Sequence, residues 1–188
     1  MKKVTLFAAL LLTSAGAFAQ NWTLDKAHSK VAFTITHLMI SEVDGNFKNF
    51  DIDMKAAKPD FSDANINFTA DIKSVSTADE KRDAHLQTAD FFDSAKYPTL
   101  SFKSKSLKKV SGNKYKLMGD LTMHGITKPV TLDAMINGPI THPMNKKTVA
   151  GFKVSGLVKR ADFALSNYPS AVLSEDVEIR ASGEFAKN

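Results

Sequence analysis

The chain has 188 residues, a formal net charge of +5 and no cysteine. The lack of cysteine excludes disulfides, thiolate catalysis, iron–sulfur clusters and cysteine-based zinc sites. Most of the basic residues are lysines scattered along the chain, so we expect no nucleic-acid partner. The mild basicity fits a solubilising surface, and an anionic small ligand or an anionic membrane surface is the alternative.

The first 19 residues have the layout of a secretory signal peptide. Lys2 and Lys3 form a basic segment, Val4 to Leu12 an apolar run, and Ala17-Phe18-Ala19 an A-x-A cleavage site. The apolar run is shorter than the about 18 residues that a membrane anchor needs. We therefore expect cleavage after Ala19, with residues 1–19 as signal peptide and residues 20–188 as one soluble, exported domain. Loss of the two lysines takes the formal charge from +5 to +3.

Most of the mature chain alternates apolar and polar residues with a period of two, which is typical of half-buried β-strands. The clear alternation covers residues 30–37, 65–72, 100–103, 115–123, 130–136, 152–158 and 177–185, and a weaker strand covers 47–54. About eight such strands predict an all-β fold, either a closed antiparallel barrel or a two-sheet sandwich.

Two connections carry local signals. Residues 125–128 join two strands at hairpin distance, and Pro129 is expected to open the second strand. Residues 76–86 lack the alternation, and Thr77 and Glu80 have the spacing of a capping box. This segment predicts a short helix with Thr77 as its N-cap.

The apolar faces are rich in phenylalanine, of which the chain has 13. An eight-stranded barrel has an interior just wide enough to be filled by side chains or to hold one small ligand, and the sequence leaves both open. Glycines within the strand patterns, such as Gly119, fit either a bent sheet or room for a ligand. The residues expected to line the interior are Phe33, Ile35, Phe47, Phe68, Phe102, Leu117, Leu121, Leu132, Phe152 and Phe163.

Seven short motifs follow one another along nearly the whole mature chain. They are Trp22-x-Leu24-Asp25-x-x-His28-Ser29-x-Val31-x-Phe33-x-x-x-His37 with Gly45-x-Phe47, Ser74-Val75-x-Thr77, Arg82-Asp83-x-His85-Leu86, Asp90-Phe91-Phe92-Asp93, Tyr97-Pro98 with Phe102, Gly119-x-Leu121-x-x-His124-Gly125, and Arg160-x-Asp162-Phe163. Together they resemble the YceI-like, polyisoprenoid-binding periplasmic proteins. Ala164 stands where that family usually has glycine, so the local turn there is expected to differ.

The resemblance implies a lipocalin-like, eight-stranded antiparallel β-barrel with one or two short helices. Its apolar interior would hold a long-chain isoprenoid or fatty amphiphile. It further implies a periplasmic carrier, sequestering or stress-response role rather than catalysis. A homodimer and a transient contact with the membrane surface are left open.

Binding of a long apolar chain needs little polar recognition, because each buried CH₂ contributes about 0.8 kcal/mol. A phosphate or carboxylate head group would need donors at the mouth of the barrel, and Arg82, His85 and Arg160 are the candidates. The alternative is that Arg82, Asp83 and His85 tie the short helix to the barrel rim through ion pairs and caps.

Metal binding and catalysis have weaker signals. The five histidines His28, His37, His85, His124 and His142 show no H-x-H or H-E-x-x-H spacing, so no metal or cofactor is expected, and a metal-binding module is the second hypothesis. Asp83 and His85 could orient an acid–base pair, but the chain has no G-x-S-x-G motif and no assigned nucleophile. A hydrolase is therefore the weakest hypothesis, and we expect no enzyme.

Overall fold

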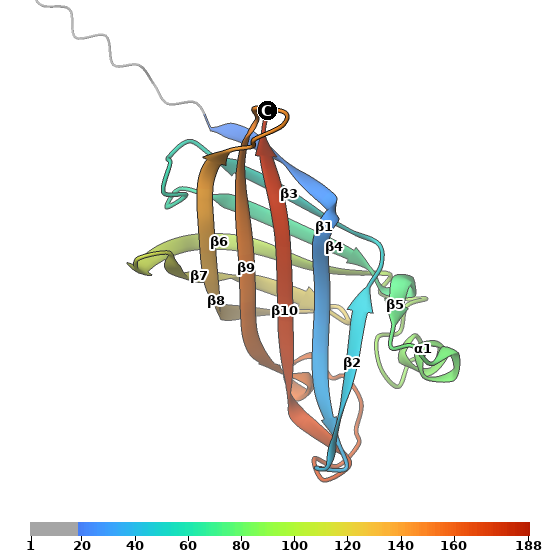
Figure 1. Ribbon diagram of the computed structural model, residues 1–188. Coiled ribbons are helices and arrows are strands. Elements are labelled where there is room, and N and C mark those ends of the chain that lie inside the picture. Colours follow the sequence, from blue (N-terminus) through green and yellow to red (C-terminus); the bar gives the residue numbers. More distant parts are fainter. Residues whose placement is uncertain (1–18) are drawn as a thin grey trace, which may run out of the picture.

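The computed structural model describes residues 19–188, which form an antiparallel β-barrel (Figure 1). The predicted signal peptide, apart from Ala19, lies outside the described residues. Between residues 19 and 188, no helix has the length and apolar character needed to cross a membrane. The elements in chain order are β1 (Gln20–His37), β2 (Ser41–Phe47), β3 (Phe50–Ala56), β4 (Asn65–Asp71), the 3-10 helix η1 (Ile72–Ser74), β5 (Val75–Ser76), α1 (Glu80–Leu86), β6 (Thr99–Ser111), β7 (Lys114–Met123), β8 (Ile126–Thr141), β9 (Thr148–Lys159), the 3-10 helix η2 (Arg160–Phe163) and β10 (Leu173–Lys187).

Eight strands close the barrel. They follow the order β1-β3-β4-β6-β7-β8-β9-β10, and the pairing of β10 with β1 completes the ring. β2 and β5 lie outside this ring, because β2 pairs with the second half of β1 and β5 pairs with β2. The predicted fold, an eight-stranded antiparallel barrel with short helices, is confirmed.

The wall of the barrel is interrupted along the middle of β1. Residues 20–22 pair with β3 and residues 32–37 pair with β2, while the pairing with β10 shifts register between Asp25 and Lys30. The Asp25 carboxylate accepts a bond from the Ala27 N–H, and the Asp25 carbonyl accepts one from the Ser29 hydroxyl. These local bonds curl residues 26–29 out of the ladder, as Asx turns and bulges do.

The half of the barrel near the C-terminus is filled. Trp22, Phe61, Phe152 and Phe185 form a chain of edge-to-face rings, with centroids 4.9, 5.1 and 5.3 Å apart. Phe61 is 1% exposed and Phe185 is 3% exposed. Gly119 belongs to the core as well, since a Cβ there would lie 2.4 Å from Cζ of Phe102. This glycine therefore makes room for a neighbouring ring.

The opposite half, near the β1–β2 turn, is not filled. Along β10 the inward positions Val177 and Ile179 are only half-buried, whereas Phe185 on the same face is fully buried. The lower part of Figure 1 shows this half, where the β1–β2 turn and the start of β10 lie. The interior is thus packed at one end and hollow at the other.

Two strand boundaries differ from the prediction. The weak strand predicted around residues 47–54 is present as β3, but its predicted start was wrong, since β2 ends at Phe47 and β3 begins at Phe50, with Lys48 and Asn49 between them. The prediction of a turn over residues 125–128 was also wrong. β7 ends at Met123 and β8 begins at Ile126, so the connection is His124-Gly125, whose φ values of 52° and 73° suit a two-residue hairpin turn.

Pro129 therefore lies inside β8 and does not open it. It sits opposite Asp120 of β7. The pairing of β8 with β9 begins only at Asp133, so Pro129 has a strand neighbour on one side alone. An edge position of this kind tolerates the missing N–H.

The short helix is present, but the predicted Thr77 cap was wrong. Asp79 is the N-cap, and its carboxylate accepts a bond of 2.9 Å from the Arg82 N–H. The N–H and hydroxyl of Thr77 instead donate to Oδ1 of Asp83, at 2.7 and 2.6 Å. Asp79 thus takes the capping position that was predicted for Thr77. Thr77, which directly follows β5, joins that strand to α1 through its bonds to Asp83.

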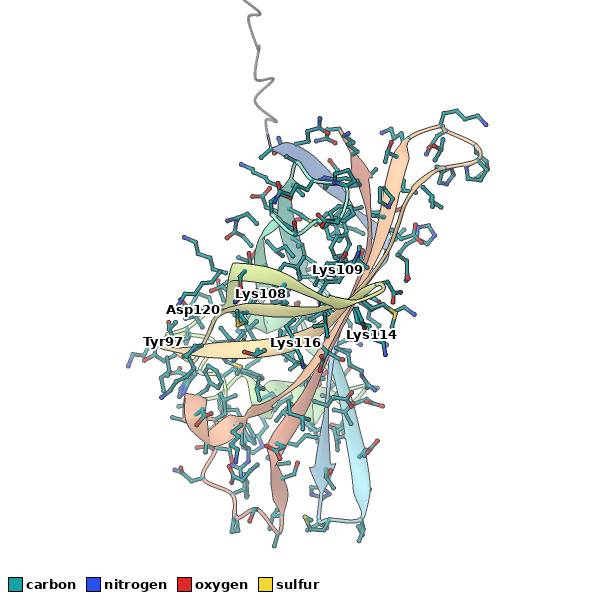
Figure 2. The ribbon with its side chains drawn as sticks, turned by 90° about the vertical axis from the view of Figure 1, so that its left-hand side faces the viewer. Tyr97, Lys108, Lys109, Lys114, Lys116 and Asp120 are labelled. Atoms are coloured by element: carbon teal, nitrogen blue, oxygen red, sulfur yellow. The ribbon has the colours of Figure 1, made fainter. Side chains whose placement is uncertain are left out.

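Lysines cover the outside of the β6–β7 hairpin. Figure 2 labels Lys108 and Lys109 on β6 and Lys114 and Lys116 on β7, all of them exposed. Lys116 pairs with Asp133 at 2.7 Å. An exposed ion pair of this kind contributes little to stability.

Candidate functional site

A cavity of about 360 Å³ occupies the hollow half of the barrel. This volume lies within the roughly 300–1,000 Å³ of ordinary small-molecule sites. Inward-facing positions of six strands form its wall. They are Phe33, Ile35, His37, Val43, Phe47, Leu100, Met123, Val158, Val177 and Ile179.

The period of two explains this apolar wall. Phe33, Ile35 and His37 are alternate residues of β1, and Val177 and Ile179 are alternate residues of β10. Phe33 lies opposite Gly45, where a Cβ would stand 2.2 Å from Cζ of the ring. Glycine at position 45 therefore leaves the space that the Phe33 side chain takes.

Two loop segments cover the cavity. One comprises α1 with the residues on either side of it, and the other begins at η2 and ends at β10. They contribute Thr77, Arg82, His85, Leu86, Phe91, Phe92, Arg160, Leu165, Tyr168, Val172 and Leu173.

An aromatic stack joins these two covering segments. The ring centroids of Phe91 and Tyr168 lie 6.1 Å apart with 29° between the ring planes, and His85 packs edge-on against Phe91 at 5.0 Å. Tyr168 is 45% exposed, so the outer side of the stack faces solvent. The side chains of Phe91 and Tyr168 therefore cover the cavity at this point.

The predicted lining residues divide between the two halves of the barrel. Phe33, Ile35 and Phe47 line the cavity. Phe68 is half-buried on β4. The other predicted residues belong to the packed core and do not line the cavity, namely Phe102, Leu117, Leu121, Leu132, Phe152 and Phe163.

Arg160 is 3% exposed and holds the second covering segment in place. Its guanidinium donates to the carbonyls of residues 165, 166, 168, 173 and 174 and to the Glu175 carboxylate, the last at 2.9 Å. These bonds use the Nε, Nη1 and Nη2 groups together. The geometry therefore gives Arg160 a supporting role under the cavity.

Arg82 and His85 also line the cavity, from the α1 side. Arg82 donates from Nε to the Thr77 hydroxyl at 2.7 Å and from Nη2 to the Thr77 carbonyl at 2.9 Å. His85 lies 3.4 Å from Asp90, while Asp83 accepts its bonds from Thr77. Among residues 19–188 no hydrogen bond joins Asp83 to His85, so the acid–base pair considered for a hydrolase is not assembled.

Sequence reasoning missed the residues of the two covering segments. Phe91, Phe92, Leu165, Tyr168 and Val172 lie on loops or turns, where no alternation marks an inward side. The signal that could have found two of them was the Asp90-Phe91-Phe92-Asp93 motif, because adjacent aromatic residues outside a strand need a surface to cover.

A small charged cluster lies on the outside of the barrel, away from the cavity. Asp25, His28 and Glu184 offer ligand atoms within 4.8 Å of one another, and all three are exposed. The hydrogen bond of 2.8 Å that Nδ1 of His28 donates to the Asp25 carboxylate raises the pKa of His28 above 6.5, and the same bond lowers the pKa of Asp25 below 3.8. The hydrogen bond between Asp25 and His28 spans the bulge of β1. The sequence did not indicate Glu184 as the third member of this cluster, because it comes from the distant strand β10.

Comparison with known proteins identifies a matching domain family and a close relative in sequence. Residues 22–185 match the YceI-like domain. The chain is 36% identical over 172 residues to a UPF0312 protein of Staphylococcus aureus (strain N315), covering 88% of this chain and 97% of the relative.

Solved structures agree on the fold. The Campylobacter jejuni YCEI protein superposes with a TM-score of 0.75 at 37% identity, covering 88% of this chain and 97% of that one. A polyisoprenoid binding domain from Saccharophagus degradans superposes with a TM-score of 0.64 at 14% identity, covering 91% and 100%. The domain match and the two relatives above 30% identity show that the chain belongs to the YceI-like family.

Proposed function

We propose that this protein is an exported, soluble carrier or sequestering protein that holds the chain of a polyisoprenoid or another long-chain amphiphile in its cavity. The observation that carries the proposal is the hollow half of the barrel, where inward apolar side chains such as Val177 and Ile179 are left half-buried. Contiguous apolar surface of this kind is unfavourable in water and marks binding sites.

The aromatic and aliphatic wall suits a flexible apolar chain. Each methylene moved from water to this surface contributes about 0.8 kcal/mol, so affinity grows with chain length and needs few polar contacts. The structural relative from Saccharophagus degradans, described as a polyisoprenoid binding domain, supports an isoprenoid as one candidate ligand class.

A pair of substitutions on neighbouring strands tests the cavity. Val177→Trp would fill the cavity from β10, whereas Leu157→Trp adds the same ring on the outside of β9, where Leu157 is 65% exposed. We expect Val177→Trp to weaken binding of a long-chain alcohol at least tenfold and Leu157→Trp to leave it unchanged, measured by calorimetry on variants whose melting is still cooperative. Equal affinities in the two variants would contradict binding inside the barrel.

Export is part of the proposal and has its own test. The basic segment, apolar run and Ala17-Phe18-Ala19 site support cleavage after Ala19. We expect N-terminal sequencing of the protein from the periplasmic fraction to begin at Gln20. Recovery of the protein in membranes with Met1 retained would contradict export as a soluble domain.

The metal-binding alternative is distinguished by what the purified protein contains. A bound lipid without metal supports the carrier. Stoichiometric metal without lipid, lost on substitution of His28 in the cluster with Asp25 and Glu184, would favour the alternative.

A further inference from the structure

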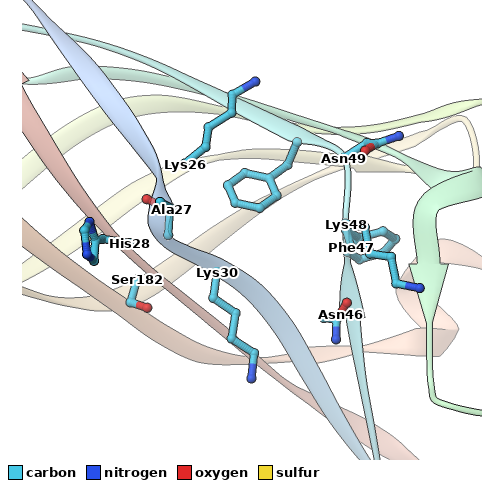
Figure 3. Close-up of a pocket in the computed structure, with 11 residues that line it drawn as sticks. Lys26, Ala27, His28, Lys30, Asn46, Phe47, Lys48, Asn49 and Ser182 are labelled. Atoms are coloured by element: carbon cyan, nitrogen blue, oxygen red, sulfur yellow. The ribbon is translucent and has the colours of Figure 1, made fainter.

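A second pocket lies at the interruption of the barrel wall beside β1 (Figure 3). Its volume is about 760 Å³. The unpaired segment 26–29 of β1 forms one side, and residues 46–50 around the β2–β3 turn form the other. The gap exists because β1 changes partner from β3 to β2 at this point.

This pocket is lined by positive charge. Lys26, Lys30 and Lys48 border it, as do the side-chain amides of Asn46 and Asn49. Neither aspartate nor glutamate occurs among the described residues that line it. Two carboxylates stand just behind the lining, Asp51 beside Lys26 and Asp25 beside His28, so the part of the surface that favours an anion is the one formed by Lys30, Lys48 and the two amides.

Two of the three lysines form no ion pair with another side chain among residues 19–188. Lys26 pairs with Asp51 at 3.5 Å. Lys30 and Lys48 take part in no ion pair within residues 19–188. Their ammonium groups are therefore available to a ligand.

Phe47 lies between this pocket and the apolar cavity, because it lines both of them. The side chain is 6% exposed and packs against Phe33 and Phe92, with ring centroids 5.9 and 6.1 Å away. One aromatic residue thus lies at the boundary between a cationic pocket and a space suited to an apolar chain.

We propose that the pocket with Lys26, Lys30 and Lys48 binds the carboxylate or phosphate head group of an amphiphile whose chain lies in the cavity, with Phe47 at the junction. This inference rests on the proposed function for the chain and adds the chemistry of the head group. It also places the head group at the interruption of the wall, away from α1, where the guanidinium of Arg82 already donates to Thr77.

Matched ligands and matched variants test the proposal. The ligands are a saturated fatty acid, the fatty alcohol of the same chain length, and inorganic phosphate. The variants are Lys30→Gln/Lys48→Gln and, as a control with the same change of charge, Lys108→Gln/Lys109→Gln on the β6–β7 hairpin (Figure 2). Affinity is measured by calorimetry at low and high salt, with thermal melting to confirm folding.

We expect Lys30→Gln/Lys48→Gln to weaken fatty-acid binding by roughly twofold to fivefold for each lysine, the size associated with an exposed ion pair, because both side chains are exposed. Binding of the alcohol should not change, the control variant should bind both ligands as the wild type does, and salt should reduce the preference for the acid. Inorganic phosphate should compete with the acid and not with the alcohol.

Three results would overturn the inference. They are fatty-acid binding that does not depend on Lys30 and Lys48, equal weakening of acid and alcohol, and phosphate binding through these lysines without any effect on the acid. Failure of the wild type to bind the alcohol would instead remove the proposed function itself, and the inference with it.

Discussion

Ala164 adopts a left-handed backbone conformation, with φ 52° and ψ 35°, at the end of η2. This is the position where the YceI-like resemblance leads one to expect glycine, and the turn keeps the glycine-like conformation without it. A left-handed L-residue costs about 1–2 kcal/mol, whereas glycine costs about 0.5–1 kcal/mol in backbone entropy. Alanine here is therefore strained.

Relief of this strain should stabilise the domain. We predict that Ala164→Gly raises the free energy of unfolding by about 0.5–1 kcal/mol in urea denaturation, because the side chain is exposed and its loss leaves no void. Ala161→Gly, an exposed alanine of the same 3-10 helix without a positive φ, should lower it. The same loss of stability in both variants would show that Ala164 is not strained.

The pair of Asp25 and His28 predicts a pH dependence at a single residue. The hydrogen bond that His28 donates to Asp25 raises the pKa of His28, so this group stabilises the fold while protonated and loses that contribution as the pH rises through the raised pKa. The pKa of Asp25 is lowered, so its contribution is lost as the pH falls through the lowered value. By NMR titration, Asp25→Asn should return the pKa of His28 toward 6.5, and an unchanged pKa would contradict the pairing.

Arg160 stabilises a whole segment of the chain, from η2 to the start of β10, through its hydrogen bonds. It is buried, and several carbonyls of that segment converge on its guanidinium. Each buried group left without a partner costs about 1–3 kcal/mol. We predict that Arg160→Ala lowers the free energy of unfolding by about 3 kcal/mol or more and also weakens chain binding, because Leu165, Tyr168 and Leu173 line the cavity.

The control for Arg160 is Arg180, an arginine on the outside of the barrel. It pairs with Asp44 at 3.1 Å in an exposed position. Arg180→Ala should change stability by no more than about 1 kcal/mol. Similar effects for the two arginines would contradict the role assigned to Arg160.

Elements with a strong period were predictable, and their junctions were not. The alternation at residues 65–72 and 115–123 marked β4 and β7 to within one residue, because a half-buried strand must alternate. The cap of α1 was missed because Thr77 and Asp79 both suit that position, and Thr77 instead bonds to Asp83, six residues further along the chain. The lysine-lined pocket was not foreseen, because it depends on β1 exchanging one partner strand for another.

At the scale of the whole molecule, the alternation predicted a barrel or a sandwich and the family resemblance implied the barrel, but neither indicated which half is hollow. Val177 and Phe185 lie on the same face of β10 and follow the same pattern, yet one faces the cavity and the other the packed core. The difference comes from Phe61 and Trp22, which fill one end, and from the two loop segments that meet over the other. Such long-range meetings leave no local period in a sequence.

The central claim is that the hollow half of the barrel carries a long-chain ligand. Native mass spectrometry of the protein purified from the periplasmic fraction, followed by solvent extraction, tests it most directly. We predict a mass equal to the chain from Gln20 plus a bound amphiphile, with the excess mass lost on extraction and much reduced in Val177→Trp. The mass of the unliganded chain in every preparation, from wild type and variant alike, would contradict the account.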